Sequence, residues 1–251
     1  YWPGHGIRLA EGPLVVFLSA IESTPGKGLG FACCGYALAV VDDPSLPVRQ
    51  WQCRVVDAPP VSFDAIPATA VLRVGEFVVG LAIRTKGVHA GALVRYPAAD
   101  LARGELGRAE WWTDDGRGWV RQNELGPRGP TFVIDDAGAE CSLHWDARTK
   151  SYLHVATYGF GATTIGLRSS RSLTEGWSQP VTVYRPPESD GTHAFVYAAK
   201  AHPGIPGPSS RDLVITYATN SFEFADLFTE QGQRTLYWPR FVLVGLGDGV
   251  P

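Results

Sequence analysis

Two carboxylates and two histidines stand where strands of this chain are expected to begin: Asp64, Glu140, His5 and His193. A protonated carboxyl group facing an ionised one, about 5–10 Å away, is the pair that cleaves glycosidic bonds. We therefore predict that Glu140 donates a proton and that Asp64 acts as base or nucleophile. The alternatives are an exposed turn residue for Glu140 and a strand cap for Asp64.

Other side chains have the chemistry to hold a sugar. His5 and His193 can bind hydroxyl groups or tune a carboxylate, although packed histidines are an equal alternative. Trp2 offers an apolar ring face for stacking. Arg168 and Arg240 each interrupt an apolar strand and need a partner, either in a structural ion pair or on the substrate. The histidines lack metal-ligand spacing, so we expect no metal site and no cofactor.

An internal repeat supplies the strands that position these residues. Four apolar segments follow polar turns at intervals of 60 to 76 residues, which fits four-stranded blades with generous loops. Each segment is preceded by a first strand and followed by a third. The predicted first strands are 6–9, 67–72, 141–145 and 195–199, the second 11–18, 75–81, 150–155 and 211–217, and the third 35–41, 91–96, 165–170 and 240–244.

In the first three units a tryptophan is expected to open a fourth strand: Trp51, Trp111 or Trp112, and Trp177. Helical character is confined to residues 222–230. The last unit stops at its third strand, and a ring of blades needs closure to remove its sheet edges. We predict an all-β, five-bladed β-propeller, of which residues 1–251 form roughly four blades of one domain, with a further blade or strand before Tyr1.

Composition excludes some partners. The net charge of −3 gives no electrostatic reason to expect nucleic acid or an acidic membrane as a partner. No apolar run reaches the roughly 18 residues of a membrane span.

Cys33 and Cys34 should point to opposite faces of a strand. The four cysteines are expected to be free thiols or to form one disulfide.

Several motifs carry a family resemblance: residues 2–6, 140–146, 168–180, 197–203 and 217–221. They resemble the secreted bacterial proteins of domain-of-unknown-function family 4185 and its neighbours, a group that contains endo-D-arabinanases. Its architecture is similar to that of the five-bladed glycosidases that cleave furanosides. The segment at Glu140 and Cys141 also resembles the acid-bearing segment of some furanosidase propellers.

The resemblance implies a secreted or cell-surface bacterial protein whose partner is a polysaccharide or oligosaccharide. The first hypothesis is a glycoside hydrolase that acts on a furanose-containing polysaccharide such as arabinan. The alternative is a non-catalytic carbohydrate-binding propeller, and a protein-interaction scaffold also fits the fold. Family members usually begin with a blade that carries a Phe-Gly-Asp-Thr-like segment, which these 251 residues lack.

Overall fold

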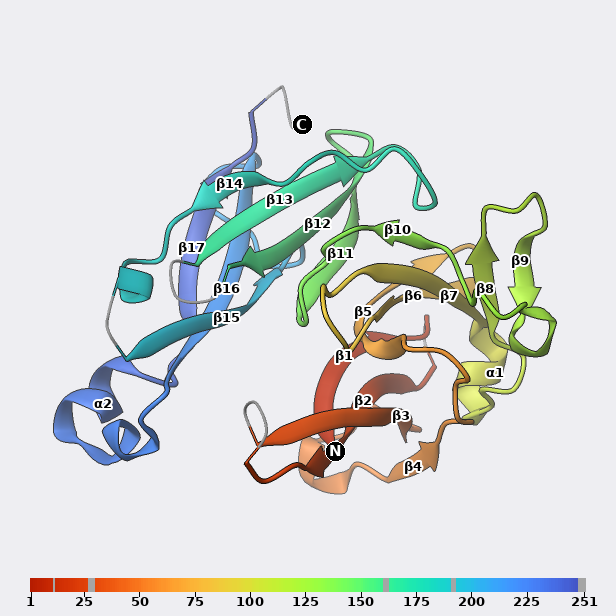
Figure 1. Ribbon diagram of the computed structural model, residues 1–251, viewed down its shortest axis with the longest axis horizontal. Helices are drawn as coiled ribbons and strands as arrows, with labels where there is room; N and C mark the ends of the chain where they lie inside the picture. The colour runs from red at the N-terminus through yellow and green to blue at the C-terminus, as the bar shows by residue number, and fades with distance from the viewer. Residues whose placement is uncertain (11, 27–29, 160–162, 191–192, 248–251) are drawn as a thin grey trace. The chain divides into compact units, whose positions relative to one another are not determined.

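The computed structural model describes residues 1–10, 12–26, 30–159, 163–190 and 193–247 (Figure 1). Almost all of their regular structure is β-strand, in four antiparallel sheets. The chain divides into two compact units, Tyr1–Asp136 and Ala137–Pro251, and each unit holds two of the sheets. The predicted all-β class is therefore confirmed, whereas the assignment of residues 1–251 to a single domain stays a prediction.

The first unit begins with a four-stranded sheet in the order β1-β2-β3-β4. Its strands are Trp2–Arg8, Leu14–Ser23, Phe31–Val41 and Cys53–Asp57. Glu11, the first residue of the predicted segment 11–18, lies outside the described residues. In β2, the fully buried Val15 and Phe17 alternate with more accessible neighbours, as expected for a strand with one face on the core.

The second sheet of this unit is larger than the sequence predicts. β5 to β9 follow in chain order and β10 pairs with β7. Their bounds are Ile66–Val74, Phe77–Ile83, Gly91–Pro97, Glu110–Thr113, Gly118–Arg121 and Phe132–Ile134. Trp111 and Trp112 both lie in β8, but a tight turn returns the chain as β9. Gly116 and Gly118 supply the positive φ angles of this turn, 89° and 72°.

The second unit holds a four-stranded and a three-stranded sheet. The first sheet has the order β11-β12-β13-β14, with bounds Cys141–Asp146, Ser151–Tyr158, Thr164–Ser170 and Val181–Tyr184. The second has the order β15-β16-β17, with bounds Ala194–Ala201, Asp212–Ser221 and Arg240–Gly245. The fourth repeat therefore has three strands in the described residues, as its sequence predicts.

The helical elements are short. They are α1 (Ala98–Arg103), α2 (Glu230–Thr235) and the 3-10 segments Val48–Gln50, Gln122–Glu124, Pro187–Asp190 and Phe224–Phe228. The segment Phe224–Phe228 falls within the predicted stretch 222–230, whereas α1 was not expected. Among the described residues no helix has the length and apolarity that crossing a membrane requires.

Two of the repeated tryptophans do not open fourth strands, contrary to the prediction. Trp51 and Trp177 lie in the loops before β4 and β14. Their indole N–H groups donate to loop carbonyls, at 2.8 Å to Leu46 O and 3.0 Å to Leu173 O. A partly buried indole needs an acceptor, and loop carbonyls are available where strand carbonyls are already paired. These tryptophans therefore fasten the loops that lead into the last strands.

Each unit has its own apolar core. In the first unit the core includes Phe17, Tyr96 and Trp111, all fully buried, and the Phe17 and Tyr96 rings lie 5.6 Å apart. In the second, Leu153 and Leu167 belong to one buried cluster shared by both sheets. Because each unit buries its own large side chains, each has its own source of hydrophobic stabilisation.

The four cysteines carry free thiols, which was the first of the two predicted alternatives. Cys33 is half-buried and packs against the core of the first unit, while Cys34 is exposed. Adjacent residues of a strand point to opposite faces, so the two environments differ as expected.

A buried histidine makes the second unit sensitive to acid. His144 in β11 is buried, and neither of its ring nitrogens has a hydrogen-bond partner among the described residues. Burial lowers the pKa of His144 to about 4, although Asp146 partly opposes the shift. Between about pH 6.5 and pH 4 the unfolded chain binds a proton here that the folded chain does not. The free energy of unfolding therefore falls as the pH falls through this range.

We expect His144→Leu to reduce the acid-induced loss in the free energy of unfolding by about 3 kcal/mol at pH 4 relative to pH 7. Urea unfolding at the two pH values measures the difference. His193→Leu, which replaces a side chain that is 62% exposed, is the control and should keep the wild-type response. Equal acid sensitivity of His144→Leu and the wild type would contradict the role given to His144.

Candidate functional site

Three of the four first strands carry a β-bulge in their N-terminal or central part. The register shifts lie between Pro3 and Gly6, between Pro67 and Ala70, and between Tyr197 and Lys200. A bulge turns side chains away from their regular direction, and bulges are frequent next to active sites. The first strands therefore present side chains in directions that a regular ladder does not allow.

Glu140 directly precedes β11, and the backbone on both sides of it is fixed. Gly138 has a φ angle of 71°, and a Cβ there would lie 3.0 Å from the Ala156 side chain, so glycine is required. On the other side, Ser142 Oγ accepts a hydrogen bond of 2.8 Å from Ala201 N of β15. The turn and this bond together determine where Glu140 lies.

The environment of Glu140 raises the pKa of its carboxyl group. The residue is half-buried, and no described group donates a hydrogen bond to its carboxylate. Burial raises the pKa of Glu140, and the positive charge of Lys200 opposes this only in part. A carboxyl group that is desolvated and receives no hydrogen bond keeps its proton to higher pH, as a general acid must.

Tyr197 and Lys200 reach this site because of the bulge in β15. In a regular strand a spacing of three residues would put them on opposite faces. The bulge pairs Tyr197 with Ala218 and Lys200 with Thr216, two residues apart on β16, so both point to one face. Ala198, within the bulge, has a φ angle of 57°, a strained value for a residue with a side chain. The sequence contained this stretch as a motif, but residue spacing alone argued against the pair.

Tyr197 keeps its hydroxyl proton in this environment. Burial raises the pKa of Tyr197 to about 12, and the neighbouring Tyr237 and Glu140 raise it further in the same direction. A neutral phenol both donates and accepts hydrogen bonds, whereas a phenolate only accepts. Tyr197 is therefore able to donate a hydrogen bond beside Glu140.

Aromatic side chains gather around the start of β15. The Phe195 ring lies 5.6 Å from that of Tyr197 and 4.7 Å from that of Phe222. Tyr237, which interacts electrostatically with Tyr197, is 66% exposed, and the next residue, Trp238, is 60% exposed. Such rings stack on apolar sugar faces while their edges remain in water. Sequence analysis missed all five residues, because four of them lie outside the predicted strand starts and none of them recurs between repeats.

Asp64 lies in the first unit and has the opposite chemistry to Glu140. Its Oδ1 accepts hydrogen bonds from Thr85 N (3.0 Å) and Thr85 Oγ1 (2.5 Å), and its Oδ2 accepts one from Lys86 N (3.1 Å). Desolvation raises the pKa of Asp64, but these hydrogen bonds outweigh it, so the pKa lies below its ordinary value. Asp64 is therefore ionised, and it also ties the start of β5 to the loop after β6.

His5 and Trp2 lie in β1 of the same unit. His5 is half-buried, and its Nδ1 accepts a hydrogen bond of 3.0 Å from Val71 N of β5. This bond joins two sheets, which is the packing role that sequence analysis left open for His5. Trp2 is 50% exposed, and its ring makes an edge contact of 4.5 Å with Phe31. Half of the Trp2 surface is therefore accessible, and stacking on a sugar stays a prediction.

His193 lies just before β15, at the surface of the second unit. Its Nδ1 is 3.6 Å from Asp226 Oδ2, and its carbonyl oxygen accepts a hydrogen bond from Phe222 N. These contacts place it next to the aromatic group around β15. A role on substrate hydroxyls stays a prediction.

Arg168 and Arg240 are engaged with protein groups. Arg168 is buried in β13, where Nε donates to Tyr158 Oη and Nη1 donates to Ser178 O, both at 3.1 Å. Arg240 Nε lies 3.4 Å from Glu188 Oε1, in an ion pair that is partly buried. These contacts belong to the structural alternative for both arginines, and their contact with a substrate stays a prediction.

The second unit therefore brings Glu140, Lys200 and Tyr197 together beside exposed aromatic rings. Asp64, His5 and Trp2 belong to the first unit. The predicted convergence of Asp64 and Glu140 on one cleft stays a prediction. What the structure adds is that the pKa values of the two carboxyl groups are shifted in opposite directions, as acid–base cooperation requires.

Lys200→Met should raise the pKa of Glu140, because it removes the positive charge that stabilises the carboxylate form. NMR titration of the Glu140 side-chain carbonyl measures this pKa directly. Lys150→Met, which replaces an exposed lysine in the β11–β12 turn, is the matched control and should leave it unchanged. A Glu140 pKa that is the same in Lys200→Met and the wild type would show that the two groups do not interact.

Residues 1–245 match the model of one protein family, described as Domain of unknown function (DUF5005). The match extends over all four sheets. It names a different family from family 4185, so the resemblance to that family is not confirmed by it. No curated protein matches the chain in sequence.

Two solved structures are similar to the chain in fold. A protein from Bacteroides ovatus ATCC 8483, provisionally classed as a hydrolase, has a TM-score of 0.69 at 16% identity, over 96% of this chain and 60% of its own. The alpha-L-arabinanase of Cellvibrio cellulosa has a TM-score of 0.51 at 11% identity, over 98% of this chain and 73% of its own. This chain thus spans 60% of the length of the first structure. The likeness shows the fold alone, which is that of the β-propeller glycosidases, and the number of blades stays a prediction.

Proposed function

We propose that this chain, which belongs to the family described as Domain of unknown function (DUF5005), forms the greater part of a five-bladed propeller that hydrolyses a furanose-containing polysaccharide. Arabinan is the substrate class we favour, because a structural relative is an arabinanase. Because the motifs of the chain resemble those of secreted bacterial proteins, the proposal includes a secreted or cell-surface location. The sequence motifs at residues 140–146 and 168–180 support the same assignment.

The observation that carries the proposal is the contrast between two carboxyl groups. Three hydrogen bonds hold Asp64 ionised, while Glu140 has no described hydrogen-bond donor and a raised pKa. Glycoside hydrolysis needs one carboxyl group in each form. Environments that separate the pKa values of two carboxyl groups identify which is the acid and which the base.

In this mechanism Glu140 protonates the oxygen of the leaving sugar as the glycosidic bond breaks. Asp64 either activates a water molecule or attacks the anomeric carbon itself. The distance between the two carboxyl groups decides the outcome: about 5–5.5 Å gives retention and about 6.5–9.5 Å gives inversion. Once Glu140 has lost its proton, the nearby charge of Lys200 stabilises the carboxylate.

The remaining side chains would hold the polysaccharide. Tyr197 donates a hydrogen bond to a sugar hydroxyl, and Trp2 and Tyr237 offer exposed ring faces. His193 reaches hydroxyls from the surface next to β15. His5, Arg168 and Arg240 already use part of their hydrogen-bonding capacity within the protein. We therefore propose that they mainly position strands and bind substrate only secondarily.

Glu140→Gln and Asp64→Asn should each reduce the rate of arabinan hydrolysis by about 10²–10⁴-fold while leaving folding intact. The measurement is the release of reducing ends from a panel of arabinans and other furanosides by the full-length protein. Glu175→Gln, which replaces an exposed loop carboxylate, is the control and should keep the wild-type rate. Full activity in both active-site variants would exclude this pair of residues.

The second candidate function is a non-catalytic carbohydrate-binding propeller, favoured by the exposed rings of Trp2, Tyr237 and Trp238. The same panel separates the two functions. Saturable binding of arabinan without release of reducing ends, by a folded full-length protein, would support the binding module. In that case Tyr237→Ala should weaken binding, whereas Glu140→Gln should not.

A further inference from the structure

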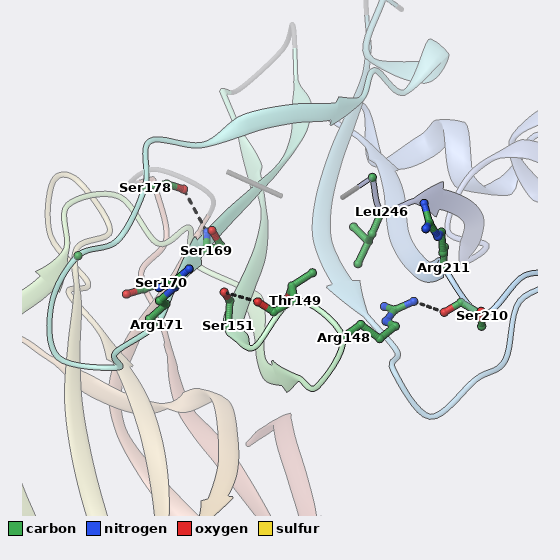
Figure 2. A pocket seen from close by; sticks show the side chains of 12 residues that line it. Arg148, Thr149, Ser151, Ser169, Ser170, Arg171, Ser178, Ser210, Arg211 and Leu246 are labelled. Carbon is green, nitrogen blue, oxygen red and sulfur yellow. Dashed lines mark hydrogen bonds between the residues drawn. The ribbon is translucent and has the colours of Figure 1, made fainter. Parts of the chain in front are cut away.

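The second unit contains a cavity of about 690 Å³ that the proposed function does not use. It is lined by the β11–β12 turn, the end of β13 with the loop that follows, the residues before β16 and those after β17 (Figure 2). Glu140 precedes β11, whereas Arg148 in the cavity wall follows it. The six residues of β11 put about 20 Å between the two places. The cavity has the size of a small-molecule site.

The charge of the cavity wall is positive. Its lining contains Arg148, Arg171 and Arg211 and no carboxylate. Arg148 is partly neutralised from behind, because its Nε donates to Asp146 Oδ1 at 2.9 Å. Arg171 makes no hydrogen bond or ion pair with any described residue. Guanidinium groups donate two parallel hydrogen bonds to carboxylate, sulfate or phosphate oxygens, so the wall selects an oxyanion.

Arg148 is held in a fixed direction. Besides the bond to Asp146, its Nη1 donates to Ser210 O across the cavity wall, and Figure 2 shows this pair on the side opposite Ser169 and Arg171. Desolvation raises the pKa of Asp146, but hydrogen bonds from Arg148 and Thr149 outweigh it, so this carboxylate stays ionised. A guanidinium fixed in this way loses little conformational entropy when it binds a ligand.

Three serine hydroxyl groups of the wall use their protons within the protein. Ser151 Oγ donates to Thr149 O at 3.2 Å, Ser170 Oγ to Glu175 O at 2.6 Å and Ser178 Oγ to Gln179 O at 3.0 Å. Each hydroxyl has one proton, and in these three it is used within the protein. Ser170 Oγ and Ser178 Oγ also each accept a backbone N–H, from Ser172 and Ser169, so one lone pair on each and both on Ser151 Oγ are left for the O–H groups of a ligand. Bare sulfate has no O–H group to offer, whereas a sugar has several.

We propose that this cavity binds an acidic saccharide unit, with its oxyanion on Arg171 and its hydroxyls on the neighbouring serines, while the positive charge of Arg211 on the opposite side adds to the attraction. A carboxylated sugar and a sulfated or phosphorylated sugar share this chemistry. A smaller cavity of about 250 Å³ shares Arg148 and Ser210 with the first and is lined partly by Ile205 and Pro206. Its apolar residues suit the face of a neutral neighbouring sugar, and its carboxylate, Asp212, disfavours a second anion.

The site would anchor an acidic branch or residue of a polysaccharide away from Glu140. The site contains neither Glu140 nor Asp64, so this proposal can be tested independently of the proposed hydrolysis. Glu140→Gln is expected to bind acidic sugars as the wild type does, which separates the failure of one proposal from the failure of the other.

The test is calorimetric titration of the full chain with D-glucuronate, D-galacturonate, glucose 6-sulfate and glucose 6-phosphate. D-glucose and D-galactose are the neutral counterparts, and inorganic sulfate is the bare anion. At least one acidic sugar should bind saturably, and at least tenfold more tightly than its neutral counterpart and than sulfate. Which acidic sugar binds distinguishes a carboxylate from a sulfate or phosphate ester as the natural group.

Arg171→Gln combined with Arg211→Gln should weaken that binding at least tenfold, whereas Arg185→Gln, which replaces an exposed arginine outside the cavity, should not. Thermal unfolding checks that the double variant is folded, and Arg171→Gln alone serves if it is not. No saturable binding of any acidic sugar overturns the proposal, as does undiminished binding by the variants. Sulfate binding as tightly as the sugars would also overturn it, because it would show recognition of the anion alone.

Discussion

The free edge of each first strand is the constraint on which the arrangement of the site depends. A first strand pairs with its sheet on one side only, and backbone N–H groups on the other side need acceptors. Each unit meets this need with a side chain from the preceding first strand. His5 Nδ1 accepts from Val71 N in the first unit, and Ser142 Oγ accepts from Ala201 N in the second. Two chemically different residues therefore perform the same task.

The hydrogen bond at Ser142 also determines which side chains of β15 lie near Glu140. Ser142 is two residues beyond Glu140, and Ala201 directly follows Lys200, so the bond sets the start of β11 against the bulged part of β15. The electrostatic coupling of Glu140 to Lys200 and Tyr197 follows from this registry. Loss of the serine hydroxyl would leave a buried N–H without its acceptor, and the alignment of the two strands would lose its anchor.

The sequence predicts the strands better than it predicts the site, for a physical reason. Apolar runs such as 75–81 are continuous because their strands are buried on both faces, and that pattern is local. The β8–β9 hairpin was missed although Gly116 and Gly118 signal its turn. Lys200 and Tyr197 were missed because a bulge reverses the face that spacing predicts, and spacing carries no sign of a bulge.

The ionisation of three aspartates depends on the hydrogen bonds that they receive. Asp64 receives three hydrogen bonds, Asp146 is bonded by Arg148 and Thr149, and the fully buried Asp100 is bonded by Arg103 and Arg108. Each of these carboxyl groups has a lowered pKa despite its desolvation.

Glu140 has no described hydrogen-bond donor, and burial raises its pKa. Hydrogen bonds thus outweigh desolvation at the three aspartates, whereas desolvation dominates at Glu140. The same accounting explains why the two ends of β11 differ. At the Glu140 end a carboxyl group lacks described donors and its pKa is raised, while at the other end Arg148 and Thr149 bond the Asp146 carboxylate and arginines line a cavity. The strand β11 therefore separates the proposed proton donor, Glu140, from the proposed anion site in the cavity.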